Sequence, residues 1–353
     1  MRKIFAISAI ALGIFAFIIP KKIKPIGTPV PFITPQGWPA PAYNFDSNRL
    51  TKEGIALGRQ LFYDGRLAKD NQTSCASCHQ QAAAFATEDH DLSHGVDNQF
   101  TTRNAPTLAN LAWQKNFHAD GGIIHLDLQP LAPLTATNEM GEEINHVLQK
   151  LRSDSVYPKL FKAAFGSELI NTQRMTRALS QFLLTMVSAN SKYDKMKRGE
   201  YAFNLPERLG YDIFKKKHCD VCHAEPLFTD FQYRNNGLTL EPVLKDFGRM
   251  RITNLPSDSL KFKVPTLRNV AVSFPYMHDG RYNSLLDVLE HYNKKIVISA
   301  TTDTLLIKKI PLSNFEKGQL LAFLYTLTDS SFLHNPNFGP PPTEKVDYGH
   351  NMH

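Results

Sequence analysis

The chain has 353 residues, of which 42% are hydrophobic and 21% are charged. This composition is typical of a globular protein that is long enough for two domains. The formal net charge of +7 is misleading, because residues 1–24 contain five Lys or Arg and no acidic residue, which leaves a net charge of +2 on the rest of the chain. Such a small charge gives no support to nucleic-acid binding.

The first 24 residues have the pattern of an export signal. Arg2 and Lys3 precede an apolar run from Ile4 to Pro20, and three lysines follow this run. The run is shorter than the ~20 residues of a comfortable membrane span, which favours a signal peptide over residues 1–24. No clear A-x-A cleavage site follows the run, so an uncleaved signal anchor stays open. We therefore predict an exported, periplasmic protein, either free or tethered to the inner membrane by its N-terminus.

Residues 25–46 are dense in proline and predict an extended arm over the surface or a linker from the membrane. Beyond this arm, apolar residues recur at intervals of three and four in several segments, which predicts helices. These segments are 54–62, 142–151, 172–189, 208–214, 284–295 and 313–328. A capping-box pattern at Ser284 opens the fifth segment, and Tyr292 falls on its apolar, inward face. Sustained strand-like alternation is absent, so the predicted fold class is mainly α with long loops.

The four cysteines fall into two CxxCH motifs. These are Cys75-Ala-Ser-Cys78-His79 and Cys219-Asp-Val-Cys222-His223. Two cysteines one helical turn apart can form thioethers with the two vinyl groups of one haem, and the histidine that follows can bind the iron. A pair of disulfides or a Cys2His-type zinc site is the alternative, but each would need the trailing histidine to occur twice by accident. The motifs therefore predict two covalently bound c-type haems.

The two motifs lie far apart, so we expect one cytochrome c-like haem domain in each half of the chain. The charged segment 191–204 places the boundary between a first domain at 47–198 and a second at 199–335. Residues 336–353 are rich in Pro and Asn and are expected to form a poorly ordered tail.

An ordered series of short motifs over residues 48–330 resembles the bacterial dihaem cytochrome c peroxidases, a family that includes the MauG-like enzymes. The motifs are Leu57-Gly-Arg-Gln-Leu-Phe62, the first CxxCH, Arg103-Asn-Ala-Pro-Thr107, Asp120-Gly-Gly122, Gln129, Asn138-Glu-Met-Gly141, the second CxxCH, Phe262-Lys-Val-Pro-Thr-Leu-Arg-Asn269 and Pro275-Tyr-Met-His-Asp-Gly280. The resemblance implies that the N-terminal haem, with His79 as proximal ligand, reacts with peroxide. The C-terminal haem, with His223, would relay electrons to it.

The resemblance also implies two catalytic side chains. Glu139 matches the family's distal acid/base, and Gln129 matches its distal amide. Peroxide cleavage requires a proton to leave the iron-bound oxygen and reach the leaving oxygen, and a carboxylate above the iron can perform both transfers. Taken alone, either residue would be interpreted as a solvated surface side chain.

Two further sites are implied by position. His94 falls in the loop where some members place a sixth ligand that blocks the peroxidatic iron until the relay haem is reduced; the alternative is an exposed loop histidine. Asn104 matches the family's side-chain ligand to a calcium ion, with the backbone carbonyls of Ser273 and Pro275 as further ligands. The alternative for Asn104 is a residue that only precedes a Pro-containing turn.

The sequence departs from the family pattern at two positions. Tyr292 stands where many members have an axial methionine, as in MauG-like proteins, and phenolate ligation would lower the relay potential; the alternative is a core tyrosine. Ala119 stands where the family usually has a tryptophan between the haems. Trp113 is nearby but out of register, so either His118 bridges the gap or transfer depends on porphyrin proximity alone.

The function implied is the reduction of hydrogen peroxide to water, with electrons from a monohaem cytochrome c or a cupredoxin that docks near the second haem. One alternative is a MauG-like oxidase that modifies residues of a partner protein, which Tyr292 supports. The other is a non-catalytic dihaem electron carrier, which would need neither Glu139 nor Gln129. Family members often form homodimers, although nothing in the residues themselves indicates one.

Overall fold

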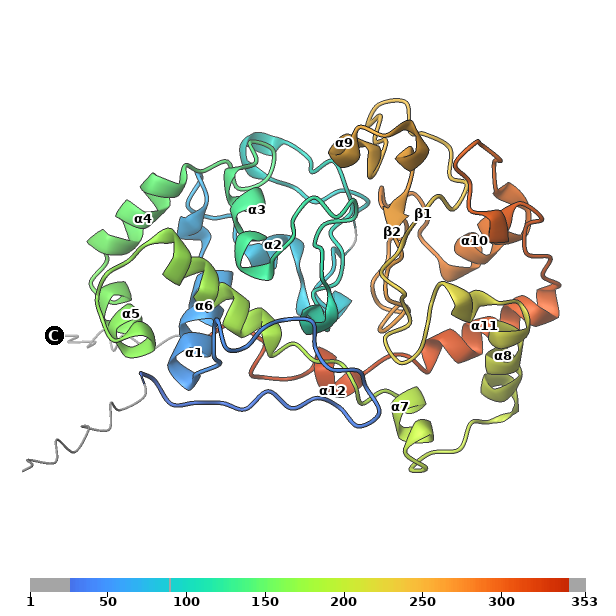
Figure 1. Cartoon of the computed structure of the whole chain (residues 1–353), viewed down its shortest axis with the longest axis horizontal. Helices are drawn as coiled ribbons and strands as arrows, with labels where there is room; N and C mark the ends of the chain where they lie inside the picture. Colours follow the sequence, from blue (N-terminus) through green and yellow to red (C-terminus); the bar gives the residue numbers. More distant parts are fainter. Residues whose placement is uncertain (1–25, 89, 343–353) are drawn as a thin grey trace, which may run out of the picture.

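A computed structural model describes residues 26–88 and 90–342. The predicted export signal and the last eleven residues of the expected tail lie outside these ranges. Within the described residues, no helix is long and apolar enough to cross a membrane. Figure 1 shows two lobes side by side, one built from the first half of the chain and one from the second, with the proline-rich arm running along one side of the first.

The fold is mainly helical with long loops, as predicted, and the two short strands found in the described residues pair antiparallel. The first half contains α1 (Lys52–Tyr63), α2 (Cys75–Cys78), α3 (Leu131–Thr135), α4 (Ile144–Ser153), α5 (Tyr157–Phe165) and α6 (Thr172–Leu184). The second half contains α7 (Lys192–Lys197), α8 (Leu205–Lys216), β1 (Tyr233–Arg234), α9 (Met250–Thr253), β2 (Phe262–Lys263), α10 (Leu285–Glu290) and α11 (Asn314–Tyr325), and α12 (Ser330–Leu333) follows. Each predicted helix is present, although the segment 284–295 divides into α10 and a π-helical turn at His291–Lys295.

The same helix pair recurs in the two halves. In the first, α1 packs on α6 at Gly58, where an added Cβ would lie 1.9 Å from the carbonyl oxygen of Ala178. In the second, α8 packs on α11 at Gly210, where an added Cβ would lie 2.0 Å from the carbonyl oxygen of Gln319. Glycine is required at both positions because only a missing side chain lets the backbones approach so closely.

A short loop motif recurs in the same way. Ala105-Pro-Thr-Leu108 and Val264-Pro-Thr-Leu267 share the Pro-Thr-Leu sequence. The Thr107 hydroxyl donates to the carbonyl of Ala84 at 2.6 Å, and the Thr266 hydroxyl donates to the carbonyl of Leu227 at 2.6 Å. Each threonine thus ties its loop to the segment that follows its own CxxCH motif, so the two halves are structural repeats.

The chain returns to the first half at its C-terminal end. Phe332 and Phe338 are 2% and 6% exposed and belong to the first hydrophobic core, next to Phe85. Arg59 on α1 donates hydrogen bonds to the carbonyl oxygens of Pro336, Gly339 and Pro340. The expectation of a poorly ordered tail is therefore wrong for residues 336–342, because an aromatic side chain and an arginine anchor hold them.

The described part of the proline-rich arm lies over the first half. The backbone N–H groups of Ala42 and Tyr43 donate hydrogen bonds to the carbonyl of Ala112, at 2.9 and 3.0 Å. Trp38 packs against Trp113, whose ring N–H donates to the carbonyl of Pro39 at 2.8 Å. Trp113 therefore serves to anchor the arm.

Candidate functional site

A single cavity of about 990 Å³ joins the two halves. Nearly all predicted site residues line it: Cys75, Cys78, His79, Asn104, Gln129, Glu139, Cys219, Cys222, His223, Ser273, Pro275 and Tyr292. The exception is His94, which is not among its lining residues. Residues that lie more than 200 positions apart in the sequence thus line one cavity.

The two proximal histidines are held in the same way. His79 Nδ1 lies 2.8 Å from the carbonyl oxygen of Phe85, and His223 Nδ1 lies 3.2 Å from those of Phe228 and Pro265. An Nδ1–H that donates to a carbonyl leaves Nε2 as the free ligand nitrogen. Burial lowers the pKa of both histidines, which favours the neutral form that a metal ligand requires.

The cysteines fit covalently bound haem. All four are unpaired, and burial raises the pKa of each thiol. In both motifs the histidine N–H donates to the carbonyl of the first cysteine, at 3.0 Å for His79 and 2.9 Å for His223. Each motif therefore forms one tight turn that presents two thiols and an imidazole to the cavity. When bound there, the haems would supply the iron chemistry that accepts peroxide and carries electrons.

Glu139 and Gln129 enter the first half of the cavity from the chain around α3. The backbone of Glu139 is fixed by hydrogen bonds to Val96 at 2.8 Å and Ala136 at 3.0 Å. Within residues 26–88 and 90–342, neither the Glu139 carboxyl nor the Gln129 amide has a hydrogen-bond partner, so both are free to meet a substrate. Burial raises the pKa of Glu139 above that of an exposed glutamate, which suits a group that must both take up and release a proton.

Tyr292 enters the second half of the cavity, on the same side of its helix as Val288 and Leu289. It lies in the π-helical turn that follows α10, and such turns often mark functional sites. Burial raises the pKa of the phenol to about 12, although the nearby Asn236 amide acts in the opposite direction. A bound cation is therefore needed for this side chain to act as a phenolate near neutral pH.

The side chain of His94 lies outside the cavity. It is exposed, and its ring centroid lies 4.6 Å from that of Phe100 and 5.0 Å from that of His90. Its carbonyl oxygen is 4.0 Å from the Sγ atom of Cys78, so the backbone is close to the first motif while the ring points elsewhere. The role of His94 as an iron ligand stays a prediction, and it would require the ring to leave this stack.

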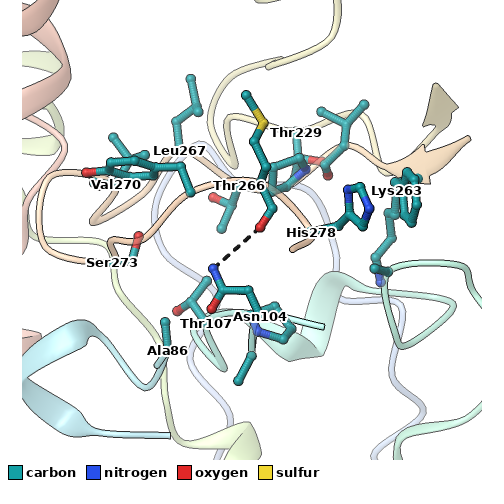
Figure 2. A pocket seen from close by; sticks show the side chains of 18 of the residues that line it. Ala86, Asn104, Thr107, Thr229, Lys263, Thr266, Leu267, Val270, Ser273 and His278 are labelled. Carbon is teal, nitrogen blue, oxygen red and sulfur yellow. Dashed lines mark hydrogen bonds between the residues drawn. The ribbon is translucent and has the colours of Figure 1, made fainter. Parts of the chain in front are cut away.

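Asn104 connects the two halves. Its amide nitrogen lies 2.5 Å from the carbonyl oxygen of Pro275 and 3.4 Å from that of Met277, whereas its buried Oδ1 has no partner in the described structure. Figure 2 shows this amide pointing at a main-chain carbonyl of the second half. Turning the amide by 180° would direct Oδ1 to the same two carbonyls, and oxygen donors of this kind suit calcium. Within the described residues, Asn104 makes no hydrogen bond to the Ser273 carbonyl, so this part of the calcium site stays a prediction.

Sequence reasoning missed the polar groups at the junction. Lys263 donates from Nζ to Gln114 Oε1 at 2.8 Å and to the carbonyl of Asn116 at 2.7 Å, and burial lowers its pKa to about 8. Its backbone N–H donates to the carbonyl of Ala119 at 2.7 Å. Lys263 precedes Val-Pro-Thr-Leu just as Asn104 precedes Ala-Pro-Thr-Leu, so the repeated motif was the signal that could have identified it.

A buried ion-pair network lies next to Lys263. Arg103 bonds to Asp120 and to Asp246 at 2.6 Å each, and so ties the first half to the second. The rings of Phe262 and His278 stack with centroids 3.8 Å apart and also line the cavity. The junction beside Ala119 is thus filled by a lysine and stacked rings.

The fold and this site define a class of protein. A family model described as di-haem cytochrome c peroxidase matches residues 52–202. A curated relative from Methylophilus methylotrophus, methylamine utilization protein MauG, is 33% identical over 306 residues, which covers 84% of this chain and 87% of the relative. The chain therefore belongs to the dihaem cytochrome c peroxidase and MauG family.

Other relatives represent both branches of that family. Cytochrome c551 peroxidase of Nitrosomonas europaea is 33% identical over 275 residues, with 77% of this chain and 79% of the relative covered. A solved structure described as a MauG-like protein associated with microbial copper homeostasis superposes with a TM-score of 0.79 at 32% identity, over 88% of this chain and 99% of that chain. The likeness thus extends to peroxidases and to MauG proteins alike.

Proposed function

We propose that the protein reduces hydrogen peroxide to water with electrons from a small redox protein. The observation that carries this proposal is the pair Glu139 and Gln129, which line the cavity with His79 and have no partner in the described structure. An electron carrier with two fully ligated irons would need neither group. In this assignment the first haem site receives peroxide, and the second relays electrons.

The side chains have separable tasks in this reaction. The Glu139 carboxylate takes a proton from one oxygen of peroxide and returns it to the other oxygen, which leaves as water. The Gln129 amide donates a hydrogen bond that orients the substrate. His79, whose Nδ1 is fixed by the Phe85 carbonyl, would hold the first haem through its other ring nitrogen. Each turnover consumes one peroxide, two electrons and two protons and produces two waters.

The test is peroxide-dependent oxidation of a reduced monohaem cytochrome c by the haem-loaded protein, both as isolated and after reduction of one haem. Rapid turnover is expected. A lag that prior reduction abolishes would support His94 as a ligand that must leave, whereas turnover without any lag would end that role. No reaction with peroxide in either state would favour the electron carrier instead.

A separate observation, the position of Tyr292, favours a second candidate function. Tyr292 lines the second half of the cavity, and MauG proteins are among the relatives. If its phenolate binds the second iron, Tyr292→Met should raise the reduction potential of that haem, because methionine ligation favours the reduced state. Tyr276, which also lines the cavity but donates to the Val270 carbonyl at 2.9 Å, supplies the control Tyr276→Phe. A low potential with poor cytochrome oxidation would favour a MauG-like oxidase acting on a partner protein.

Two further assignments belong to this proposal. Asn104, with the carbonyl of Pro275 and its neighbours, binds a calcium ion that joins the two halves. The chain is exported to the periplasm through residues 1–24. Calcium is tested by chelation, which should lower the thermal midpoint of wild type but not that of Asn104→Ala.

A further inference from the structure

The cavity opens at the second haem site. Lys216 and Lys309 line the cavity together with Leu305 and Leu306 and with the two cysteines of the second motif. Leu305 is 47% exposed, so this wall of the cavity is also molecular surface. Figure 1 shows the loop between α10 and α11, which carries Leu305, at the edge of the second lobe that faces away from the first.

Apolar side chains surround this opening. Val221, between the two cysteines, is 46% exposed, and Ile307 is 50% exposed. Val221 stands between the two cavity-lining cysteines and Ile307 follows Leu306, so both segments that line this part of the cavity carry exposed aliphatic side chains. An exposed apolar patch beside a redox centre is the usual core of a protein docking surface.

Unpaired cations form the rim of this patch. Five exposed lysines belong to the segments that surround it, and none has an ion pair within the described residues: Lys216, Lys294, Lys295, Lys308 and Lys309. The Nζ atom of Lys309 lies 2.7 Å from the carbonyl of Lys294, which brings the two lysine segments together.

The acids near the rim are mostly neutralised. Asp220 pairs with Lys215 at 2.8 Å, Glu316 with Lys217 at 2.9 Å, and Asp303 with Arg234 at 2.7 Å. Asp212, one turn before Lys216 on α8, is the exposed acid beside the rim. The rim therefore carries a clear positive excess.

We infer that this surface, formed by Val221, the loop 305–309 and the lysine rim, is the docking site of an acidic electron-donor protein. The inference rests on the proposed function and adds the charge of the donor. Apolar contact at the centre would bring the donor's redox group next to the second haem, and the lysines would steer a negatively charged partner toward it. Such encounters are small and transient, so charge contributes chiefly to the association rate.

The experiment compares two reduced monohaem cytochromes c, one acidic and one strongly basic, as donors to the haem-loaded full chain. The second-order rate should be higher for the acidic cytochrome by roughly tenfold or more at low salt, and this advantage should shrink as salt screens the rim. The double variant Lys216→Glu and Lys308→Glu should remove the preference. Lys159→Glu on α5, an exposed lysine of the first half, is the matched control and should keep the preference.

A second measurement separates the two proposals. Each variant is also assayed with peroxide and a small organic reductant, which needs no docking, and the cytochrome rates are normalised to that value. If wild type fails with the small reductant, the proposed function fails, and salt-dependent binding of the acidic cytochrome still tests the surface. Equal rates for both cytochromes, or a preference that survives the rim reversal, would overturn the docking site. Covalent oxidation of the bound acidic protein would identify it as a substrate and overturn its role as donor.

Discussion

The two halves of the molecule use one scaffold for two different sites. Each has a helix pair closed by a glycine, a CxxCH turn, a histidine held by carbonyls and a Pro-Thr-Leu loop. They differ in other residues that line the cavity, since the first half presents Glu139 and Gln129 and the second presents Tyr292. Haem attachment is thus encoded in local motifs, whereas the chemistry of each haem depends on loops that arrive from later in the chain.

The largest expected effect is the loss of peroxide reduction when the acid/base group that distinguishes the first site from the second is removed. Glu139→Gln keeps the size of the side chain and removes the base, so peroxide reduction should fall by on the order of 10²–10⁴ in rate. Stopped-flow kinetics on protein with both haems bound measures this loss. Glu143→Gln changes an exposed acid four residues away and should leave the rate near wild type. Near-normal turnover of Glu139→Gln would remove Glu139 from the mechanism.

A second difference between the repeats is structural. Ala109 follows the first Pro-Thr-Leu, but Arg268 follows the second and is fully buried, bonded to Asp194 at 2.8 Å and stacked on Trp38 at 4.4 Å. Arg268→Ala leaves Asp194 buried without its partner, so the free energy of unfolding should fall by about 3–5 kcal/mol. Denaturant titration measures this change.

Two controls test whether the loss in Arg268→Ala comes from a buried ion pair. The first removes an exposed ion pair, and the second removes both partners of the buried pair. Lys162→Ala breaks an exposed pair with Glu168 and should cost about 1 kcal/mol or less. The double variant Asp194→Ala and Arg268→Ala should cost less than the sum of the two single changes, because neither charge is then left alone. Strict additivity would contradict the interpretation of a buried pair.

The shared part of the scaffold predicts equal effects. Gly58→Ala and Gly210→Ala should each destabilise by about 1–3 kcal/mol, since either methyl group would overlap a backbone carbonyl of the partner helix. Haem absorbance in variants that retain one CxxCH motif reports on each half separately. Gly318→Ala, an exposed α11 position with nothing within 4 Å of the added carbon, should instead stabilise by up to about 1 kcal/mol. Unequal losses of stability in Gly58→Ala and Gly210→Ala would contradict the conclusion that the two helix pairs are equivalent repeats.

The smallest expected effect concerns pH. Because burial raises the pKa of Glu139, its carboxylate form predominates only above that raised pKa. The rate of reaction with peroxide should therefore decline, as pH falls, at a higher pH than the ~4.3 of an ordinary glutamate. Rate profiles of wild type and Glu139→Gln test this, and the decline should be absent from the variant. An identical pH–rate profile in wild type and Glu139→Gln would show that another group causes the decline at low pH.

The sequence alone was sufficient to predict the features that depend on residues close together in the chain. Spacing and apolar periodicity predicted the helices and the two haem turns, because both depend on residues within one or two turns of each other. Glu139, Gln129 and Tyr292 became candidates only through the resemblance, because each resembles an ordinary surface or core residue in isolation.

The remaining features depend on contacts across the whole chain. Phe338 packs beside Phe85, and Arg59 reaches Gly339 over 280 positions, which a Pro- and Asn-rich composition does not reveal. Lys263 and Arg268 are buried cations whose partners come from other segments. The repeated Pro-Thr-Leu was visible in the sequence and would have pointed to both.

The return of the chain to the first half affects the order of biosynthesis. The first core includes Phe332 and Phe338, which are synthesised after the whole second half. The first CxxCH motif therefore emerges long before the core around it can close. An attachment enzyme that needs an accessible thiol pair meets this site while its domain is still incomplete, whereas the core of the second half is complete by Leu327.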